Sequence, residues 1–151
     1  MENVNNDESL DLEKIKEVLP YRGRWLLLKE VLSVDKNMIR ARTWFSKNLC
    51  EGHFEKRLIV PGALISEAMK QTAAFMVMSS DSVEKNVLPA IKRETFNYKG
   101  IVLPEETIEI EVKLLTEKNG FYFFEGEAKK EKNTVLEGKF IGVKINKKEG
   151  F

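Results

Sequence analysis

A histidine and a glutamate stand near each other in the stretch GHFEKRLIVPGALISEAMKQ, which runs from residue 52 to residue 71. His53 is the single histidine of the chain, and Glu67 lies in an otherwise largely apolar run. Histidine ordinarily titrates near neutral pH and suits a general base. A carboxyl group in apolar surroundings has its ionised form disfavoured and suits a proton donor. The pair therefore predicts proton-transfer chemistry.

A third group of the same stretch could stabilise negative charge. Pro61 and Gly62 open the apolar run, so the backbone N–H groups of Gly62 and Ala63 should be free at the start of a helix. Such N–H groups can bind a developing oxyanion, and a glycine lets a ligand approach the backbone closely. An acid, a base and an oxyanion donor together fit proton loss beside a carbonyl, with expulsion of a hydroxyl.

The same residues also have an ordinary structural interpretation. His53 and Glu67 are fourteen positions apart, so they can meet only if the loop folds back or if two subunits share a site. Glu67 and Lys70 could form an i,i+3 pair, and His53 could be a turn residue. On a helical wheel five positions form a polar stripe, and spacing alone favours its solvation: Ser66, Glu67, Lys70, Gln71 and Ala74.

Composition predicts one domain over residues 1–151, with about the first eight residues disordered. The chain is 42% hydrophobic and 32% charged, and its net charge of +1 gives no reason to expect a nucleic acid or an acidic membrane as partner. A lone cysteine, Cys50, cannot form an internal disulfide. No apolar run reaches the roughly 20 residues of a membrane span, and the start does not read as a secretory signal. We therefore expect a soluble, cytoplasmic protein.

Hydrophobic periodicity predicts an α+β fold. A short helix is expected over residues 9–19, capped by Ser9 or Asp11 and stopped by Pro20. A long helix should follow Pro61 up to about Ser80, with core around most of it. Strands are expected over 25–34, 38–46, 87–98, 106–115, 121–130 and 134–145. One apolar helix among five or six strands suggests an antiparallel sheet that curls around the helix.

Four segments resemble the (3R)-hydroxyacyl-acyl-carrier-protein dehydratases of the FabZ type, which belong to the hot-dog superfamily. The family's run GHFPGxPVxPGVLxxEAMAQ stands here as GHFEKRLIVPGALISEAMKQ, without a gap between histidine and glutamate. LPYRGRWLLLKEVL is similar to the opening LPHRxPFLLVDRVL, and two later family segments resemble TFNYKGIVLPEETIEIEVKLL and EGEAKKEKNTVLEGKFIGVKI. The resemblance covers about residues 15–145 and implies a hot-dog fold.

The resemblance implies a role for each residue of the site. His53 matches the histidine that takes the C2 proton of a 3-hydroxyacyl thioester, and Glu67 matches the carboxyl group that protonates the departing 3-hydroxyl. Gly62, with Ala63 beside it, matches the N–H that polarises the thioester carbonyl. The family builds its sites between subunits, which implies a homodimer or a trimer of dimers. No metal or other cofactor is implied.

The resemblance also implies an acidic acyl carrier protein with a phosphopantetheine arm as partner. Six basic residues are candidates for contacting it, although exposed basic residues are common: Arg22, Arg24, Arg57, Lys92, Arg93 and Lys99. Leu64, Met69, Met76 and Met78 could line an acyl tunnel, or could simply be core.

The chain departs from the family pattern in three places. Glu55-Lys56 and Leu58 replace a Pro-Gly and a proline after GHF, Tyr21 replaces the histidine of the opening motif, and Pro104-Glu105-Glu106 replaces Pro-Gly-Asp. These changes leave a hot-dog thioesterase and a non-catalytic acyl-binding subunit as alternatives. A Cys50–His53 nucleophile is a further alternative, but no third orienting group is evident.

Overall fold

A helix of seventeen residues forms the centre of the fold. In the computed structural model, which describes residues 11–80 and 86–146, α3 spans Gly62–Met78. Pro61 precedes its first residue with a φ of −55°, and the helix ends where the Ser79 N–H donates to the Phe75 carbonyl. Its buried positions run almost continuously from Ile65 to Met76. The prediction of a long helix wrapped by core is confirmed.

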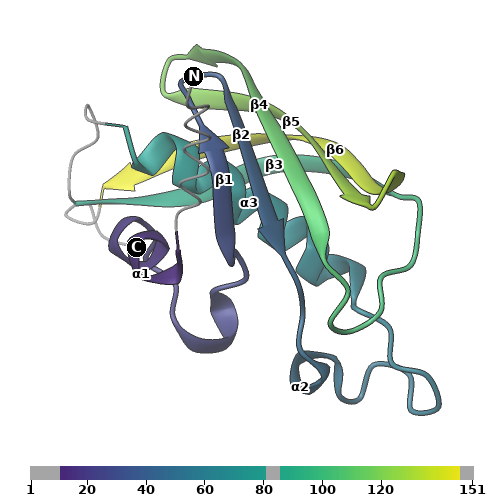
Figure 1. The fold of residues 1–151 in the computed structure, drawn as a ribbon. Helices are drawn as coiled ribbons and strands as arrows, with labels where there is room; N and C mark the ends of the chain where they lie inside the picture. Colours follow the sequence, from purple (N-terminus) through teal and green to yellow (C-terminus); the bar gives the residue numbers. More distant parts are fainter. Residues whose placement is uncertain (1–10, 81–85, 147–151) are drawn as a thin grey trace, which may run out of the picture.

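An antiparallel sheet curves around α3 (Figure 1). Its strands in the described residues are β1 (Glu30–Val34), β2 (Met38–Thr43), β3 (Val87–Tyr98), β4 (Ile108–Lys118), β5 (Phe121–Lys130) and β6 (Asn133–Asn146). Their order in the sheet is β1-β2-β4-β5-β6-β3, and every neighbouring pair is antiparallel. The predicted α+β, hot-dog arrangement is confirmed.

The inner face of the sheet follows the period of two seen in the sequence. On β4, Ile108, Ile110 and Val112 are buried against the helix while the residues between them face outward. β4 and β5 are joined through Asn119 and Gly120, whose φ angles of 53° and 80° are those of a type I′ hairpin. The turn predicted there is confirmed.

The first predicted strand is shorter than expected. Residues 25–29 do not join the sheet, because the N–H groups of Leu27 and Leu28 donate to the side-chain oxygen of Gln71. A short 3-10 helix, η1 (Gly23–Trp25), precedes this segment, and β1 begins only at Glu30. A contact with a residue more than forty positions away decides this boundary, and local periodicity does not report it.

The amino-terminal helix, α1, spans Leu12–Val18. The Asp11 carboxylate accepts a hydrogen bond from the Lys14 N–H at 3.3 Å, as expected of its cap, whereas Ser9 lies outside the described residues. The expected disorder of residues 1–8 also falls outside them. A four-residue helix, α2 (Lys47–Cys50), lies in the connection between β2 and α3. Within 11–80 and 86–146, no helix has the length and hydrophobicity to cross a bilayer.

Candidate active site

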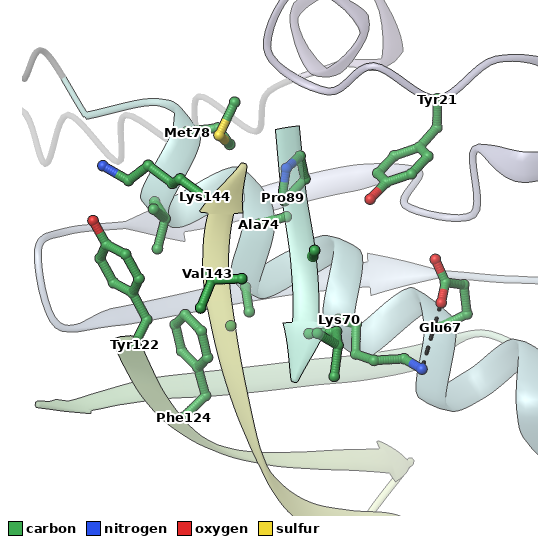
Figure 2. Close-up of a pocket in the computed structure, with 15 residues that line it drawn as sticks. Tyr21, Glu67, Lys70, Ala74, Met78, Pro89, Tyr122, Phe124, Val143 and Lys144 are labelled. Atoms are coloured by element: carbon green, nitrogen blue, oxygen red, sulfur yellow. Dashed lines mark ion pairs between the residues drawn. The ribbon is translucent and has the colours of Figure 1, made fainter. Parts of the chain in front are cut away.

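A cavity of about 280 Å³ opens between α3 and one end of the sheet. Its wall is mostly apolar and includes Ala73, Ala74 and Val77 from α3, Pro89–Ile91 from β3, Tyr122 and Phe124 from β5, and Gly142 and Val143 from β6. Glu67, Lys70 and Tyr21 form its polar end in Figure 2. A partly exposed carboxyl group therefore lies beside a cavity that could accept an acyl chain.

Glu67 has two partners on its own helix. Its Oε2 lies 3.6 Å from the Lys70 Nζ, and its Oε1 accepts a hydrogen bond of 3.3 Å from the Gln71 Nε2. Lys70 also pairs with the Glu94 carboxylate at 2.8 Å. The predicted Glu67–Lys70 pair is confirmed.

The solvated stripe predicted along α3 is wrong. Three of its members, Ser66, Gln71 and Ala74, are buried, because the segment of residues 19–32 and the sheet cover this side of the helix. Glu67 and Lys70 remain partly exposed. The polar side chains of α3 therefore line the cavity or are buried, and they do not form a solvent-exposed stripe.

Gln71 fixes the segment that precedes β1 and also contacts the candidate acid. Its Nε2 donates to the Trp25 carbonyl at 2.6 Å as well as to Glu67, and its Oε1 accepts from the N–H groups of Leu27 and Leu28. The side chain is 1% exposed. Helical spacing predicted Gln71 only as part of the solvated stripe, although an amide in an apolar helix is expected to have specific partners.

Tyr21 enters the cavity from the segment between α1 and η1. Figure 2 shows its hydroxyl directed into the cavity, at the end that Glu67 also lines. Burial, and secondarily the charge of Glu67, raise the pKa of the Tyr21 phenol. The hydroxyl is therefore a proton donor over the whole neutral range.

His53 lies in a tight turn after α2. Gly52 and Phe54, on either side of it, both have left-handed backbone conformations, with φ angles of 84° and 64°. The His53 Nδ1 lies 2.8 Å from the Ile59 carbonyl oxygen. A carbonyl can only accept, so Nδ1 carries the proton in the neutral ring and Nε2 keeps a free lone pair. That tautomer suits a base.

The predicted oxyanion donors lie at the start of α3. Among the described residues no acceptor bonds the N–H of Gly62 or Ala63, whereas the Leu64 N–H already donates to the Pro61 carbonyl. The ring of Tyr98 covers Gly62 so closely that a Cβ added there would lie 2.6 Å from the Tyr98 Cε1. A larger residue at this position would have to displace the Tyr98 ring.

The candidate base and the candidate acid are not joined within one chain. His53 is not among the residues that line the cavity beside Glu67, and no hydrogen bond or ion pair of the described residues connects the two. A single chain therefore presents the candidate acid beside a cavity and the candidate base elsewhere.

The predicted tunnel residues divide into two groups. Met78 lines the cavity. Met69 and Met76 are buried in the core, where the Met69 sulfur lies against Gly126 of β5, and Leu64 is partly buried beside the core. For Met69 and Met76, the interpretation as core holds.

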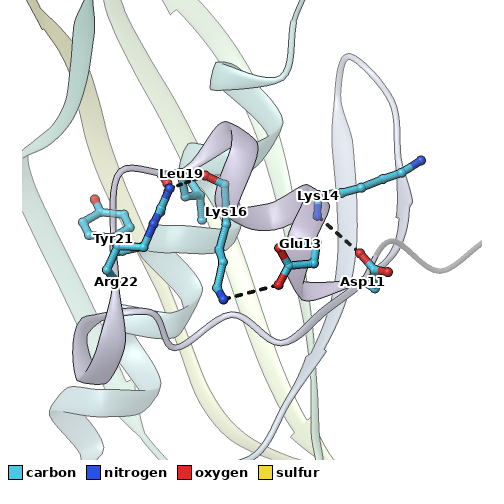
Figure 3. Close-up of polar contacts among 7 residues, drawn as sticks. All are labelled: Asp11, Glu13, Lys14, Lys16, Leu19, Tyr21 and Arg22. Carbon is cyan, nitrogen blue, oxygen red and sulfur yellow. Dashed lines mark hydrogen bonds and ion pairs between the residues drawn. The ribbon is translucent and has the colours of Figure 1, made fainter.

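The six basic candidates differ in what their side chains contact. The Arg22 guanidinium donates to the carbonyls of Lys16, Leu19 and Tyr21, so it holds the end of α1 (Figure 3). Lys99 pairs with Glu137 at 2.7 Å. All six are exposed, and within the described residues the side chains of the other four form no hydrogen bond or ion pair: Arg24, Arg57, Lys92 and Arg93.

Cys50 does not form a nucleophilic pair with His53. The thiol is fully buried, and burial, with a smaller effect of Glu105, raises its pKa. The one hydrogen bond between the two residues runs from the His53 backbone N–H to the Cys50 carbonyl. A protonated, buried thiol is a poor nucleophile.

The altered turn at residues 104–106 keeps a left-handed residue. Glu105 has a φ of 68°, its N–H donates to the Phe45 carbonyl, and its carboxylate accepts from the Lys47 N–H at the start of α2. The conformation that a glycine would adopt freely is thus held by contacts of the glutamate with its neighbours.

Comparison with known proteins finds relatives that match most of the chain. The FabA-like domain family matches residues 19–139. The chain is similar to the 3-hydroxyacyl-[acyl-carrier-protein] dehydratase FabZ of Shewanella baltica, at 31% identity over 91% of this chain and 94% of that protein. The FabZ of an Anaeromyxobacter species is 26% identical, with 93% of each chain covered.

Solved structures support the fold. The dehydratase heterocomplex ApeI:P from Xenorhabdus doucetiae superposes with a TM-score of 0.72 at 20% identity, covering 89% of this chain and 93% of the other. Cj0977, a sigma28-regulated virulence protein from Campylobacter jejuni, gives a TM-score of 0.70 at 13% identity over 96% of both chains.

Proposed function

We propose, from the premise that this chain belongs to the FabA-like family and is a FabZ-type dehydratase, that it removes water from a (3R)-3-hydroxyacyl thioester. The product is a trans-2-enoyl thioester, and the enzyme is a hydro-lyase of fatty acid biosynthesis or a related lipid or polyene pathway. The observation that carries this proposal is the carboxyl group of Glu67 at the polar end of an apolar cavity.

His53 is the base in this proposal. The Ile59 carbonyl holds the proton on Nδ1, so Nε2 can take the C2 proton of the thioester. Glu67, in its protonated form, gives a proton to the 3-hydroxyl, which departs as water. Each proton thus has a defined acceptor, and the C2–H and C3–O bonds break as the double bond forms.

The N–H groups of Gly62 and Ala63 bind the thioester oxygen. They lie at the amino end of α3, where the helix dipole favours the negative charge that grows on that oxygen as C2 loses its proton. Glu67 follows Gly62 by about one and a half turns of the same helix. One rigid element therefore positions both the carbonyl and the leaving hydroxyl.

The active site is shared between two copies of the chain. Two observations support this: His53 lies outside the cavity that Glu67 lines, and β3 is a twelve-residue edge strand with a partner on only one side among the described strands. A long edge strand can pair with a second copy. We propose at least a homodimer, in which His53 of one copy acts with Glu67 of the other.

The relatives are named for substrates on acyl carrier protein, and we propose the same class of carrier here. Exposed Arg24, Arg57, Lys92 and Arg93 are the better candidates for contacting an acidic carrier, because Arg22 and Lys99 already have partners within the chain. We place the protein in the cytoplasm, where this carrier is used.

The test is hydration of crotonyl- and longer enoyl-thioesters by the purified protein, followed through the loss of enoyl-thioester absorbance. His53→Ala and Glu67→Gln are compared with the unaltered protein. Each should lower kcat by about 100-fold or more, because each removes a proton-transfer group.

Three results would have different meanings. Hydration without thiol release, lost in both variants, supports the dehydratase and both roles. Release of free thiol that survives His53→Ala would identify a thioesterase instead. A well-folded oligomer that is inactive with every thioester would leave a non-catalytic acyl-binding subunit.

A further inference from the structure

Tyr21 places a hydrogen-bond donor beside the candidate acid without using it in the fold. Its ring is partly buried against the core, and its hydroxyl points into the cavity at the polar end that Glu67 also lines (Figure 2). In the part of the chain that the structure describes, this hydroxyl has no hydrogen-bond partner. The donor is therefore available to a molecule bound in the cavity.

The backbone that carries Tyr21 is held firmly. The Arg22 guanidinium bonds the Tyr21 carbonyl at 2.6 Å and the Leu19 carbonyl at 2.8 Å, and Leu19 is buried (Figure 3). These contacts hold the backbone at Tyr21 from outside the cavity. A donor positioned in this way loses little conformational freedom when a ligand accepts its hydrogen bond.

Lys70, the other donor at this end of the cavity, is less suited to bind a hydroxyl. Its ammonium is already paired with Glu94 at 2.8 Å and with Glu67 at 3.6 Å. The phenol of Tyr21 stays protonated, since burial and the neighbouring carboxylate raise its pKa. A neutral donor and a carboxyl group therefore face the same space.

We propose that Tyr21 is a substrate-contacting residue whose hydroxyl donates a hydrogen bond to the 3-oxygen of the hydroxyacyl thioester, opposite Glu67. This inference rests on the proposed dehydratase function. The C3–O bond breaks, its electron pair stays on the oxygen, and Glu67 supplies the proton that completes water. Tyr21 keeps its own proton and holds the 3-oxygen by the same hydrogen bond in the bound hydroxyacyl thioester and in the transition state.

The proposal predicts a difference between the two directions of the reaction in Tyr21→Phe. The enoyl thioester has no 3-oxygen, so its binding should not change, and hydration should lose kcat by about five-fold to ten-fold at constant KM. The 3-hydroxyacyl thioester loses a hydrogen bond already in the bound state. Dehydration should therefore show the loss mainly as a higher KM.

The experiment measures both directions with short-chain thioesters for three proteins: unaltered, Tyr21→Phe and Tyr122→Phe. Tyr122 lines the same cavity but lies away from Glu67 in Figure 2, so its hydroxyl is the matched control. Thermal unfolding of each variant separates a folding defect from a kinetic one.

A lower kcat in hydration together with a higher KM in dehydration, seen in Tyr21→Phe and absent in Tyr122→Phe, supports the proposed role of Tyr21. Unchanged kinetics of Tyr21→Phe, or an equal rise in KM for both thioesters, would overturn it while the dehydratase function stands. An unaltered protein without activity in either direction would overturn the proposed function, and this inference with it.

Discussion

At the scale of the residue, the candidate site depends on buried polar groups that each have a defined partner. Gln71 binds Glu67 and also satisfies three backbone groups of the segment 25–28. His53 is set in one tautomer by the Ile59 carbonyl. In the proposed mechanism, these supporting contacts decide where each proton is held before the substrate arrives.

Replacing Gln71 by leucine should destabilise the fold and lower activity together. The N–H groups of Leu27 and Leu28 and the Trp25 carbonyl would lose their partner in a buried place, which should lower the free energy of unfolding by about 2–4 kcal/mol. Urea unfolding measures this. Lys70→Gln is the control, because it removes a charge beside Glu67 and leaves the segment bound. An equal, small effect of both variants would contradict the role of Gln71.

Cys50 should make stability decline at high pH. Its raised pKa means that the folded protein keeps a thiol proton that the unfolded chain has lost. The free energy of unfolding therefore falls as the pH rises from the ordinary thiol pKa of about 8.5 toward the raised value. Urea unfolding at about pH 8 and about pH 10 should show a smaller decline in Cys50→Ala than in the unaltered chain. The same decline in both would mean that the buried thiol does not contribute.

At the scale of the element, α3 combines two parts of the proposed mechanism. Its first turn holds the free N–H groups, and its second turn carries the proposed acid, Glu67. The β3 residue Tyr98 covers the start of the helix. Because the helix is buried along most of its length, both features are held at a fixed separation by the core.

Gly62→Ala should reduce kcat by about ten-fold or more, because the added methyl group would crowd a thioester oxygen at the N–H groups. The methyl group would also displace the Tyr98 ring, which is exposed and can move. The double variant Gly62→Ala/Tyr98→Ala separates the two effects. Recovery of activity in the double variant would mean that the glycine serves only the packing of Tyr98.

At the scale of the whole molecule, the proposed site needs two chains, and mixing inactive variants tests this. His53→Ala and Glu67→Gln homodimers should each be inactive. A mixed dimer has one intact site, so random exchange of subunits should restore about a quarter of the unaltered activity. Mixtures of either variant with itself are the controls. Absence of recovery after demonstrated subunit exchange would place both residues of a site in the same chain.

The sequence by itself determined the elements and the kind of fold. The period of two on β4, the Asn119-Gly120 turn and the long apolar helix after Pro61 are local properties, because side-chain spacing and backbone preference act over a few residues. The candidates His53, Glu67 and Gly62 also came from the sequence, through residue chemistry and the resemblance of their segment to one family. Their proposed roles depend on that resemblance.

The tertiary structure alone decided which distant residues share a space. It brought Tyr21 and Glu67 to one cavity, gave Gln71 its partners in the segment before β1, and committed Arg22 to the end of α1. It also kept His53 away from the cavity of its own chain. The first two of these join residues more than forty positions apart, and the third lies beyond the end of a helix, so the period of a single helix or strand cannot report them. The helical wheel placed Gln71 on a solvated stripe, and only the packing of another segment over α3 made it a buried support of the site.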